Sequence, residues 1–320
     1  MWLRTTAVFT ALCVTLAACG RSAAPAAPAA EGAASFATAP ALALGSSSGP
    51  AREPRSAPLV TDSADGVHIE YHVYGHGEPA VVLIHGWSCN STYWREQIPA
   101  LESRYTTVTL DLAGHGGSGR NRSDWSMAAF GQDVAAVVQR LPNHRIVLVG
   151  HLMGGPVALE AAPLIGERLI GIVGVDTFRS LGLPPPPHQV VDRQIAAFRS
   201  DFVGEMHRFV PLLFAKSAPR AFVHEVADDM AHEPPRIAIA TLVGLNSMDY
   251  ATLLPRIHVP IVAIDSYSGR MVSEARIRKL APGFRLITLG SPGDFLMLEA
   301  PREFNPILLH EIAALANAGR

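Results

Sequence analysis

The sequence feature that most constrains the fold is a short stretch at residues 146–155. It begins with four aliphatic residues at 146–149 and continues Gly150-His151-Leu152-Met153-Gly154-Gly155. A continuous apolar run of this kind is typical of a buried strand, and the segment that follows at 156–162 is typical of a helix. Glycines on both sides of the turn indicate that backbone and helix approach each other closely. The stretch therefore predicts a sharp strand-to-helix turn.

This turn has the Gly-x-x-x-Gly frame of a nucleophile elbow, with Gly150 and Gly154 as the frame glycines. The central position of such an elbow carries a nucleophilic side chain. Here it carries Leu152, which has no lone pair with which to attack a carbonyl carbon. The sequence therefore predicts an elbow whose nucleophile is missing.

Apolar stretches alternate with helical ones along much of the chain. Strands are predicted at 67–74, 80–84, 106–110, 169–175, 259–264 and 285–289, and helices from about residue 92 and at 127–141, 273–280 and 301–318. This alternation favours an α/β fold built on a mostly parallel sheet with helices on both faces. Residues 178–250 break the alternation and predict a helical cap insertion.

The N-terminal part of the chain predicts export and lipid attachment. A short apolar run ends Leu16-Ala17-Ala18-Cys19, which resembles a bacterial lipobox. We expect residues 1–19 to be a lipoprotein signal peptide and Cys19 to carry the lipid, which would anchor the protein in the bacterial cell envelope, on the periplasmic or outer-membrane side. An ordinary signal peptide is the alternative. Residues 20–58, rich in Ala and Pro, predict a disordered tether before a domain at 59–320.

The composition limits the classes of ligand and partner. Hydrophobic residues make up 48% of the 320 positions, which is enough for a large core, and the net charge is −2. The chain has no basic cluster, so we expect no nucleic-acid partner. It also has no metal-ligand spacing such as His-Glu-x-x-His, so we expect no metal and no cofactor.

Several motifs together resemble those of the α/β-hydrolase family. They are His85-Gly86-Trp87 after one predicted strand, Asp-Leu-Ala-Gly-His-Gly at 111–116 after the next, the elbow, and the segment 293–301, which is similar to the family's His loop. Their order and spacing agree with the family over about residues 63–318. The resemblance implies the α/β-hydrolase fold with a cap, and a catalytic triad in the chain order Ser, acid, His.

Two of the three triad positions hold residues that cannot perform the family's chemistry. Leu152 stands at the Ser position and Asp294 at the His position. A carboxylate lacks the paired nitrogens with which an imidazole accepts from the nucleophile and donates to the acid. The acid position has two candidates, Asp265 and Asp176, each near the end of a predicted strand. The resemblance also implies an oxyanion hole made by the backbone N–H groups of Trp87 and Met153.

The sequence therefore favours a lipid-anchored pseudoenzyme or inactivated variant with a ligand-binding or scaffolding role. Its ligand would be small, apolar or ester-like, and would lie under the cap. Losing a triad member lowers turnover by roughly 10⁴- to 10⁶-fold in serine hydrolases. One alternative is an active hydrolase of small esters, amides or lactones, with its nucleophile relocated to Ser88, Cys89, Ser266 or Ser268. Another is a different chemistry on the same fold, such as cofactor-free oxygenation, but Asp294 weighs against it because such relatives keep the His.

Overall fold

The structure is a computed structural model, and it describes residues 57–181, 183, 186–266, 273–290 and 293–318. The predicted signal peptide, Cys19 and nearly all of the predicted tether lie outside these residues. The candidate nucleophile Ser268 lies outside them as well.

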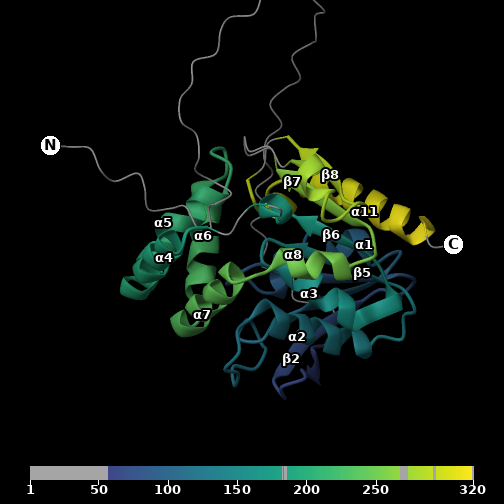
Figure 1. Cartoon of the computed structure of the whole chain (residues 1–320), viewed down its shortest axis with the longest axis horizontal. Coiled ribbons are helices and arrows are strands. Elements are labelled where there is room, and N and C mark those ends of the chain that lie inside the picture. The colour runs from purple at the N-terminus through teal and green to yellow at the C-terminus, as the bar shows by residue number, and fades with distance from the viewer. Residues whose placement is uncertain (1–56, 182, 184–185, 267–272, 291–292, 319–320) are drawn as a thin grey trace, which may run out of the picture.

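In the described part of the chain, eight strands form one sheet, in the order β1-β2-β4-β3-β5-β6-β7-β8 (Figure 1). Their bounds are β1 (Leu59–Asp62), β2 (His68–Tyr74), β3 (Ala80–Ile84), β4 (Thr106–Leu110), β5 (Ile146–His151), β6 (Leu169–Val175), β7 (Ile261–Ser266) and β8 (Arg285–Leu289). β2 pairs antiparallel with β1 and β4, and every other pairing is parallel. The prediction of a mostly parallel sheet is confirmed.

Helices cover both faces of the sheet, so its central strands are buried throughout. Every residue of β3, β4 and β5 is buried, which explains the continuous apolar sequence of β3 and the apolar start of β5, whereas β4 buries three threonines. α2 (Met127–Gln139) packs against α3 (Gly154–Ile165), and α11 (Pro301–Ala318) lies against β6 and the short α1 (Ile98–Leu101). These layers fix the carboxyl ends of the parallel strands at one edge of the sheet, where the candidate site lies.

Several element boundaries differ from the predictions. The helix expected from about residue 92 is a 3-10 turn, η1 (Ser91–Trp94), followed by α1; the Asn90 side chain accepts from the Thr92 N–H and caps η1. The helix expected at 273–280 is the single turn α9 (Glu274–Ile277). β7 begins two residues later than expected and ends at Ser266 rather than 264, which places Asp265 inside the strand.

A helical segment separates β6 from β7. It contains η3 (Phe178–Ser180), α4 (His188–Ser200), α5 (Phe202–Phe209), η4 (Val210–Leu213), α6 (Arg220–Ala231), α7 (Pro235–Asn246), α8 (Tyr250–Leu253) and η5 (Leu254–Arg256). Figure 1 shows α4, α5, α6 and α7 grouped together at one side of the sheet. Helical structure therefore covers the segment predicted as a cap, and it continues a few residues beyond it.

Within the described ranges, no single helix is long and apolar enough to cross a membrane. α7, taken together with α8 and η5, is long and apolar enough to do so, but the two parts meet at a bend of 64°. Several side chains of α7, such as Ile237, Ala238 and Leu242, are fully buried in the hydrophobic core.

Candidate functional site

The predicted elbow is formed by β5, Leu152 and the start of α3. Leu152 has a φ of 45°, in the left-handed region that leucine rarely adopts. A Cβ on Gly150 would overlap the Gly154 carbonyl oxygen, so the strand and helix can meet this closely only with glycine there. The Leu152 N–H donates to the Val175 carbonyl at 3.0 Å. The strained geometry of a nucleophile elbow is thus present, with a half-buried leucine at its tip.

The residues implied as oxyanion donors flank this tip. Trp87 follows β3, and Met153 is the N-cap residue of α3. Over the described ranges, neither of their backbone N–H groups donates to a backbone carbonyl. The Trp87 indole donates to the Ala238 carbonyl of α7 at 2.8 Å, and its ring packs edge-on against Phe198. The oxyanion loop is thereby attached to the helical segment above it.

Asp294 lies in a loop that its own backbone holds in place. Its N–H donates to the Leu213 carbonyl at 2.5 Å, and its carbonyl lies 2.9 Å from His151 Nε2. His151 is fully buried beside the ring of Phe295, and burial lowers its pKa to about 4. A neutral imidazole with Nε2 protonated donates to the Asp294 carbonyl. These two contacts use main-chain atoms of Asp294 and do not depend on its side chain.

The Asp294 side chain pairs with an arginine that the sequence analysis did not identify. Arg179, only 5% exposed, places Nη1 2.9 Å from Asp294 Oδ1. Its Nη2 donates to Asp176 Oδ1 and, at 2.8 Å, to Ser266 Oγ. Its Nε lies 4.0 Å from Asp265 Oδ2. One guanidinium therefore joins the residue at the His position to both candidate acids.

The charges in this cluster are buried, and their environment changes how they titrate. Burial raises the pKa of Asp265 to about 6; nearby Arg179 opposes the rise, and Asp294 adds to it. Asp265 is only 2% exposed, and among the described residues neither of its oxygens has a hydrogen-bond partner at ordinary geometry, although the nearby Thr177 backbone also opposes the rise in its pKa. A guanidinium stays protonated at all ordinary pH values, so Arg179 cannot act as a general base. The arrangement is an ion-pair network in which Arg179 lies within 4.0 Å of Asp176, Asp265 and Asp294.

Arg179 could have been expected from the sequence on physical grounds. A buried carboxylate needs a cation or several hydrogen-bond donors, and Asp176, Asp265 and Asp294 were all predicted near one edge of the sheet. Arg179 stands three residues after Asp176, at the start of the helical segment. It is therefore a basic residue near these acids in the sequence that could have been proposed as their counter-charge.

Among the described residues, no histidine makes a hydrogen bond with Ser88, Cys89 or Ser266. Ser266 Oγ donates to Asp176 Oδ1 at 2.9 Å, and that carboxylate is already paired with Arg179. Burial is the main cause that raises the pKa of Cys89, and nearby Asp229 adds to it, so the thiol stays protonated and weakly nucleophilic. Ser88 has a φ of 53° and a buried hydroxyl without a hydrogen-bond partner in the described structure.

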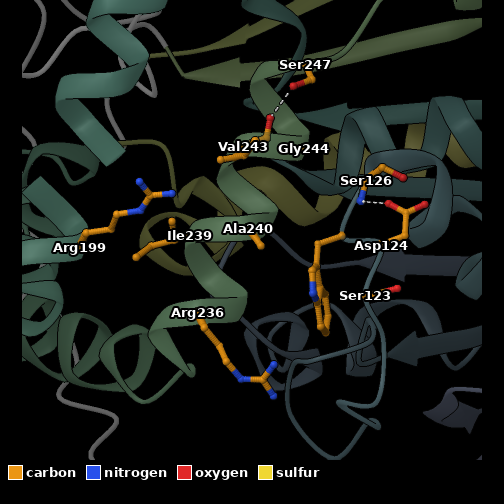
Figure 2. Close-up of a pocket in the computed structure, with 11 residues that line it drawn as sticks. Ser123, Asp124, Ser126, Arg199, Arg236, Ile239, Ala240, Val243, Gly244 and Ser247 are labelled. Carbon is orange, nitrogen blue, oxygen red and sulfur yellow. Dashed lines mark hydrogen bonds between the residues drawn. The ribbon is translucent and has the colours of Figure 1, made fainter. Parts of the chain in front are cut away.

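An open pocket lies away from the elbow, between α7 and the loop before α2. Its volume is about 730 Å³, and Trp125, Ile239, Ala240 and Val243 form the apolar part of its lining. Figure 2 shows Arg199 and Arg236 reaching into this region from α4 and α7, opposite Asp124 and Ser126. None of the residues at the triad positions lines it. The described residues also contain no group of three His, Cys, Asp or Glu side chains arranged to hold a metal ion.

Comparison with known proteins extends these observations. An uncharacterized protein of Mycobacterium bovis is 36% identical over 124 residues, which are 38% of this chain and only 36% of that relative's length. A Petunia hybrida protein named Karrikin insensitive 2 receptor CA is 24% identical to this chain. The matched region covers 75% of this chain and 94% of the length of the Petunia protein. The solved structure of an esterase from Exiguobacterium antarcticum covers 80% of this chain and all of its own, with a TM-score of 0.72 and 20% identity.

The family model described as the alpha/beta hydrolase family matches residues 81–307. That range contains the elbow, the oxyanion loop, the helical segment and Asp294, in the order that the sequence motifs predicted. The chain belongs to the alpha/beta hydrolase family.

Proposed function

We propose that this chain is a non-hydrolytic member of its family, a pseudoenzyme that binds a ligand or serves as a scaffold. The observation that carries the proposal is the contact of Asp294 with Arg179 at 2.9 Å, together with Leu152 at the elbow. Hydrolysis by this fold needs a nucleophile and a base that deprotonates it. Leu152 supplies neither a hydroxyl nor a thiol, and Asp294 is held in an ion pair.

The proposed ligand is a small apolar or ester-like molecule under the helical segment. Trp87 and the phenylalanines Phe198 and Phe209 form an aromatic group between the oxyanion loop and that segment. Among the described residues the N–H groups of Trp87 and Met153 donate to no backbone carbonyl, so both could donate hydrogen bonds to a carbonyl oxygen of the ligand. The Petunia relative is named as a receptor, which supports binding as a role for members of this family.

An active hydrolase with a relocated nucleophile is the second candidate. The unused oxyanion donors favour it, and Ser88 is the most suitable nucleophile because it adjoins Trp87 and its hydroxyl has no partner in the described part of the chain. The likeness to the Exiguobacterium esterase shows the shared fold alone. This candidate needs a base for Ser88 that the described residues do not supply.

We expect the full-length protein to hydrolyse p-nitrophenyl acetate no faster than the buffer, because the nucleophile and base positions are both filled by inert groups. The measurement is the initial rate for the parent and for Ser88→Ala, Cys89→Ala and Ser266→Ala, with fluorophosphonate labelling read by mass spectrometry. Equal rates and no label support the pseudoenzyme. A measurable rate that one substitution abolishes identifies the nucleophile and contradicts the proposal.

We also propose attachment to the bacterial envelope through a lipid on Cys19, because the preceding Leu-Ala-Ala resembles a lipobox. Expressed with its own N-terminus in a bacterial host, the parent is expected in the detergent-soluble membrane fraction. Cys19→Ser should move most of the protein to the soluble fraction or stop its processing, and Cys89→Ser is the matched control. A Cys19→Ser protein that fractionates with the parent would rule out the lipid anchor.

A further inference from the structure

A buried glutamate in the helical segment faces a buried histidine of the core. Glu233, in the turn between α6 and α7, is 8% exposed, and His115, in the loop after β4, is fully buried. Glu233 Oε1 lies 3.9 Å from His115 Nε2, and neither atom has a hydrogen-bond partner in the described structure. A buried polar atom without a hydrogen-bond partner costs free energy, and a buried charge costs more. The stability of this contact therefore depends on whether Glu233 is protonated.

His115 is fixed in the neutral form. Its Nδ1 lies 3.0 Å from the Ala113 carbonyl, to which it donates, and this leaves Nε2 as the acceptor that faces Glu233. Its ring packs 4.9 Å from that of His85 and 6.0 Å from that of Phe130. Burial, followed by the neighbouring His85, lowers the pKa of His115 to about 3.

The groups around Glu233 come from the core and from its own segment. Burial raises the pKa of Glu233 to about 8; Arg120 opposes the rise and Asp111 adds to it. Cys89 also lies within the range of its charge, and Asp229 stands four residues earlier at the end of α6. Glu233 is therefore protonated at neutral pH, and its burial is tolerated because it carries no charge.

The turn that carries Glu233 lies where α6 and α7 contact the core. Just before it, Asp229 accepts from the Tyr93 hydroxyl at 2.7 Å and from the Asn90 amide at 3.3 Å. Just after it, the Ala238 carbonyl accepts from the Trp87 indole at 2.8 Å. An ionised carboxylate at this point would have to be hydrated, and water can reach it only if these contacts loosen.

We propose that Glu233 and His115 form a proton-dependent latch that holds the α6–α7 part of the helical segment closed on the core. With Glu233 protonated the turn stays seated against His115. With Glu233 ionised the turn moves toward water, α7 follows it, and the contact between Ala238 and Trp87 opens. The latch does not depend on whether the protein hydrolyses esters.

The direction of the pH effect follows from linkage. In the open form Glu233 has an ordinary pKa near 4.5, whereas in the closed form its pKa is about 8. The closed form therefore binds the proton more tightly, and raising the pH between these values favours opening by about tenfold per pH unit. Below this interval and above it, the open fraction no longer changes with the charge of this group.

Hydrogen–deuterium exchange of the full-length protein tests the latch. After correction for intrinsic exchange, protection of the amides in α6 and α7 should fall about tenfold per pH unit from roughly pH 5 to 8 and then level off. In Glu233→Gln, which keeps the shape and removes the charge, the same amides should show protection that is independent of pH. Glu225→Gln, which removes an exposed charge from α6, should follow the parent. Glu233→Ala carries the same expectation as Glu233→Gln if the latter does not fold.

Two results would overturn the proposal. One is a loss of protection in α6 and α7 that is equally steep in the parent and in Glu233→Gln, or absent from both. The other is a parallel loss in β3 and β5, which would show that the whole domain unfolds rather than this segment. Because the readout is exchange and not ester hydrolysis, neither result depends on the proposed function.

Discussion

Replacing Arg179 with methionine is expected to destabilise the folded protein by about 3–5 kcal/mol at pH 7, the range found when one partner of a buried ion pair is removed. The substitution keeps an unbranched side chain but removes the cation that Asp176 and Asp294 contact directly. Both buried carboxylates would then lose the guanidinium that neutralises them. Urea unfolding monitored by circular dichroism measures the loss.

The pH dependence of this loss has a definite sign. Without the guanidinium, the pKa values of Asp176 and Asp294 in the folded state rise above their ordinary values. When the pKa of an acid is higher in the folded state than in the unfolded state, the folded state binds the proton more tightly. Raising the pH from the unfolded pKa to the folded pKa therefore lowers the free energy of unfolding. The deficit of Arg179→Met should therefore shrink below about pH 4, where the carboxyls are protonated in both states.

Arg208→Met is the matched control for this prediction. Arg208 also contacts two acids, Asp201 and Glu205, but its side chain is 51% exposed. Surface ion pairs contribute about 0–1 kcal/mol, so this variant should be nearly as stable as the parent. If the two variants lose similar stability at pH 7, the Arg179 network does not hold the site together.

The double substitution Leu152→Ser with Asp294→His is expected to raise p-nitrophenyl acetate hydrolysis by at least about 100-fold over the parent. Each single substitution should give less than about a tenfold gain, because the members of a triad act as a unit. The glycine frame and the strained φ at 152 are already present, and in the described part of the chain the N–H groups of Trp87 and Met153, the proposed oxyanion donors, donate to no backbone carbonyl. Asp265, whose oxygens have no hydrogen-bond partner at ordinary geometry within the described ranges, is the acid expected to orient the introduced imidazole.

Leu152→Ser with Asp294→Asn is the control for the double substitution. It introduces the same hydroxyl and removes the same charge, but it supplies no base. The measurement is the initial rate of p-nitrophenyl acetate hydrolysis by the two purified double variants, and only the variant with the histidine is expected to be faster than the parent. If the two double variants are equally slow, Arg179 keeps the acids from acting in a triad, and removing the arginine would be the next requirement for activity.

The sequence predicted the bounds of several strands to the residue. The predictions at 80–84, 106–110, 169–175 and 285–289 match β3, β4, β6 and β8 to the residue. β3 and β6 are covered on both sides, so their apolar residues mark their ends. β4 is rich in threonine and β8 is an edge strand with one buried residue, so hydrophobicity does not explain those two matches. β1 was expected only as the start of the domain, because just one of its four side chains is buried and its sequence shows little apolar pattern.

The site was predictable as a set of positions and not as a set of contacts. The residues at the nucleophile, His and oxyanion positions followed from motif order. The choice between Asp176 and Asp265 stayed open, and the structure shows both beside Arg179, a residue in no motif. Contacts between side chains from β6, β7 and distant loops depend on three-dimensional packing, which local pattern does not encode.

The loop at Asp294 is held by main-chain contacts to Leu213 and His151, and this has an evolutionary consequence. These contacts use main-chain atoms of residue 294, so they remain possible when its side chain changes, although the ion pair with Arg179 does depend on that side chain. A lineage could therefore exchange an imidazole for a carboxylate in one mutational step and retain a folded protein. Under the proposed function, a loop held by main-chain contacts would let a member of the family lose its hydrolytic residues and stay folded. Natural selection could then continue to act on ligand binding alone.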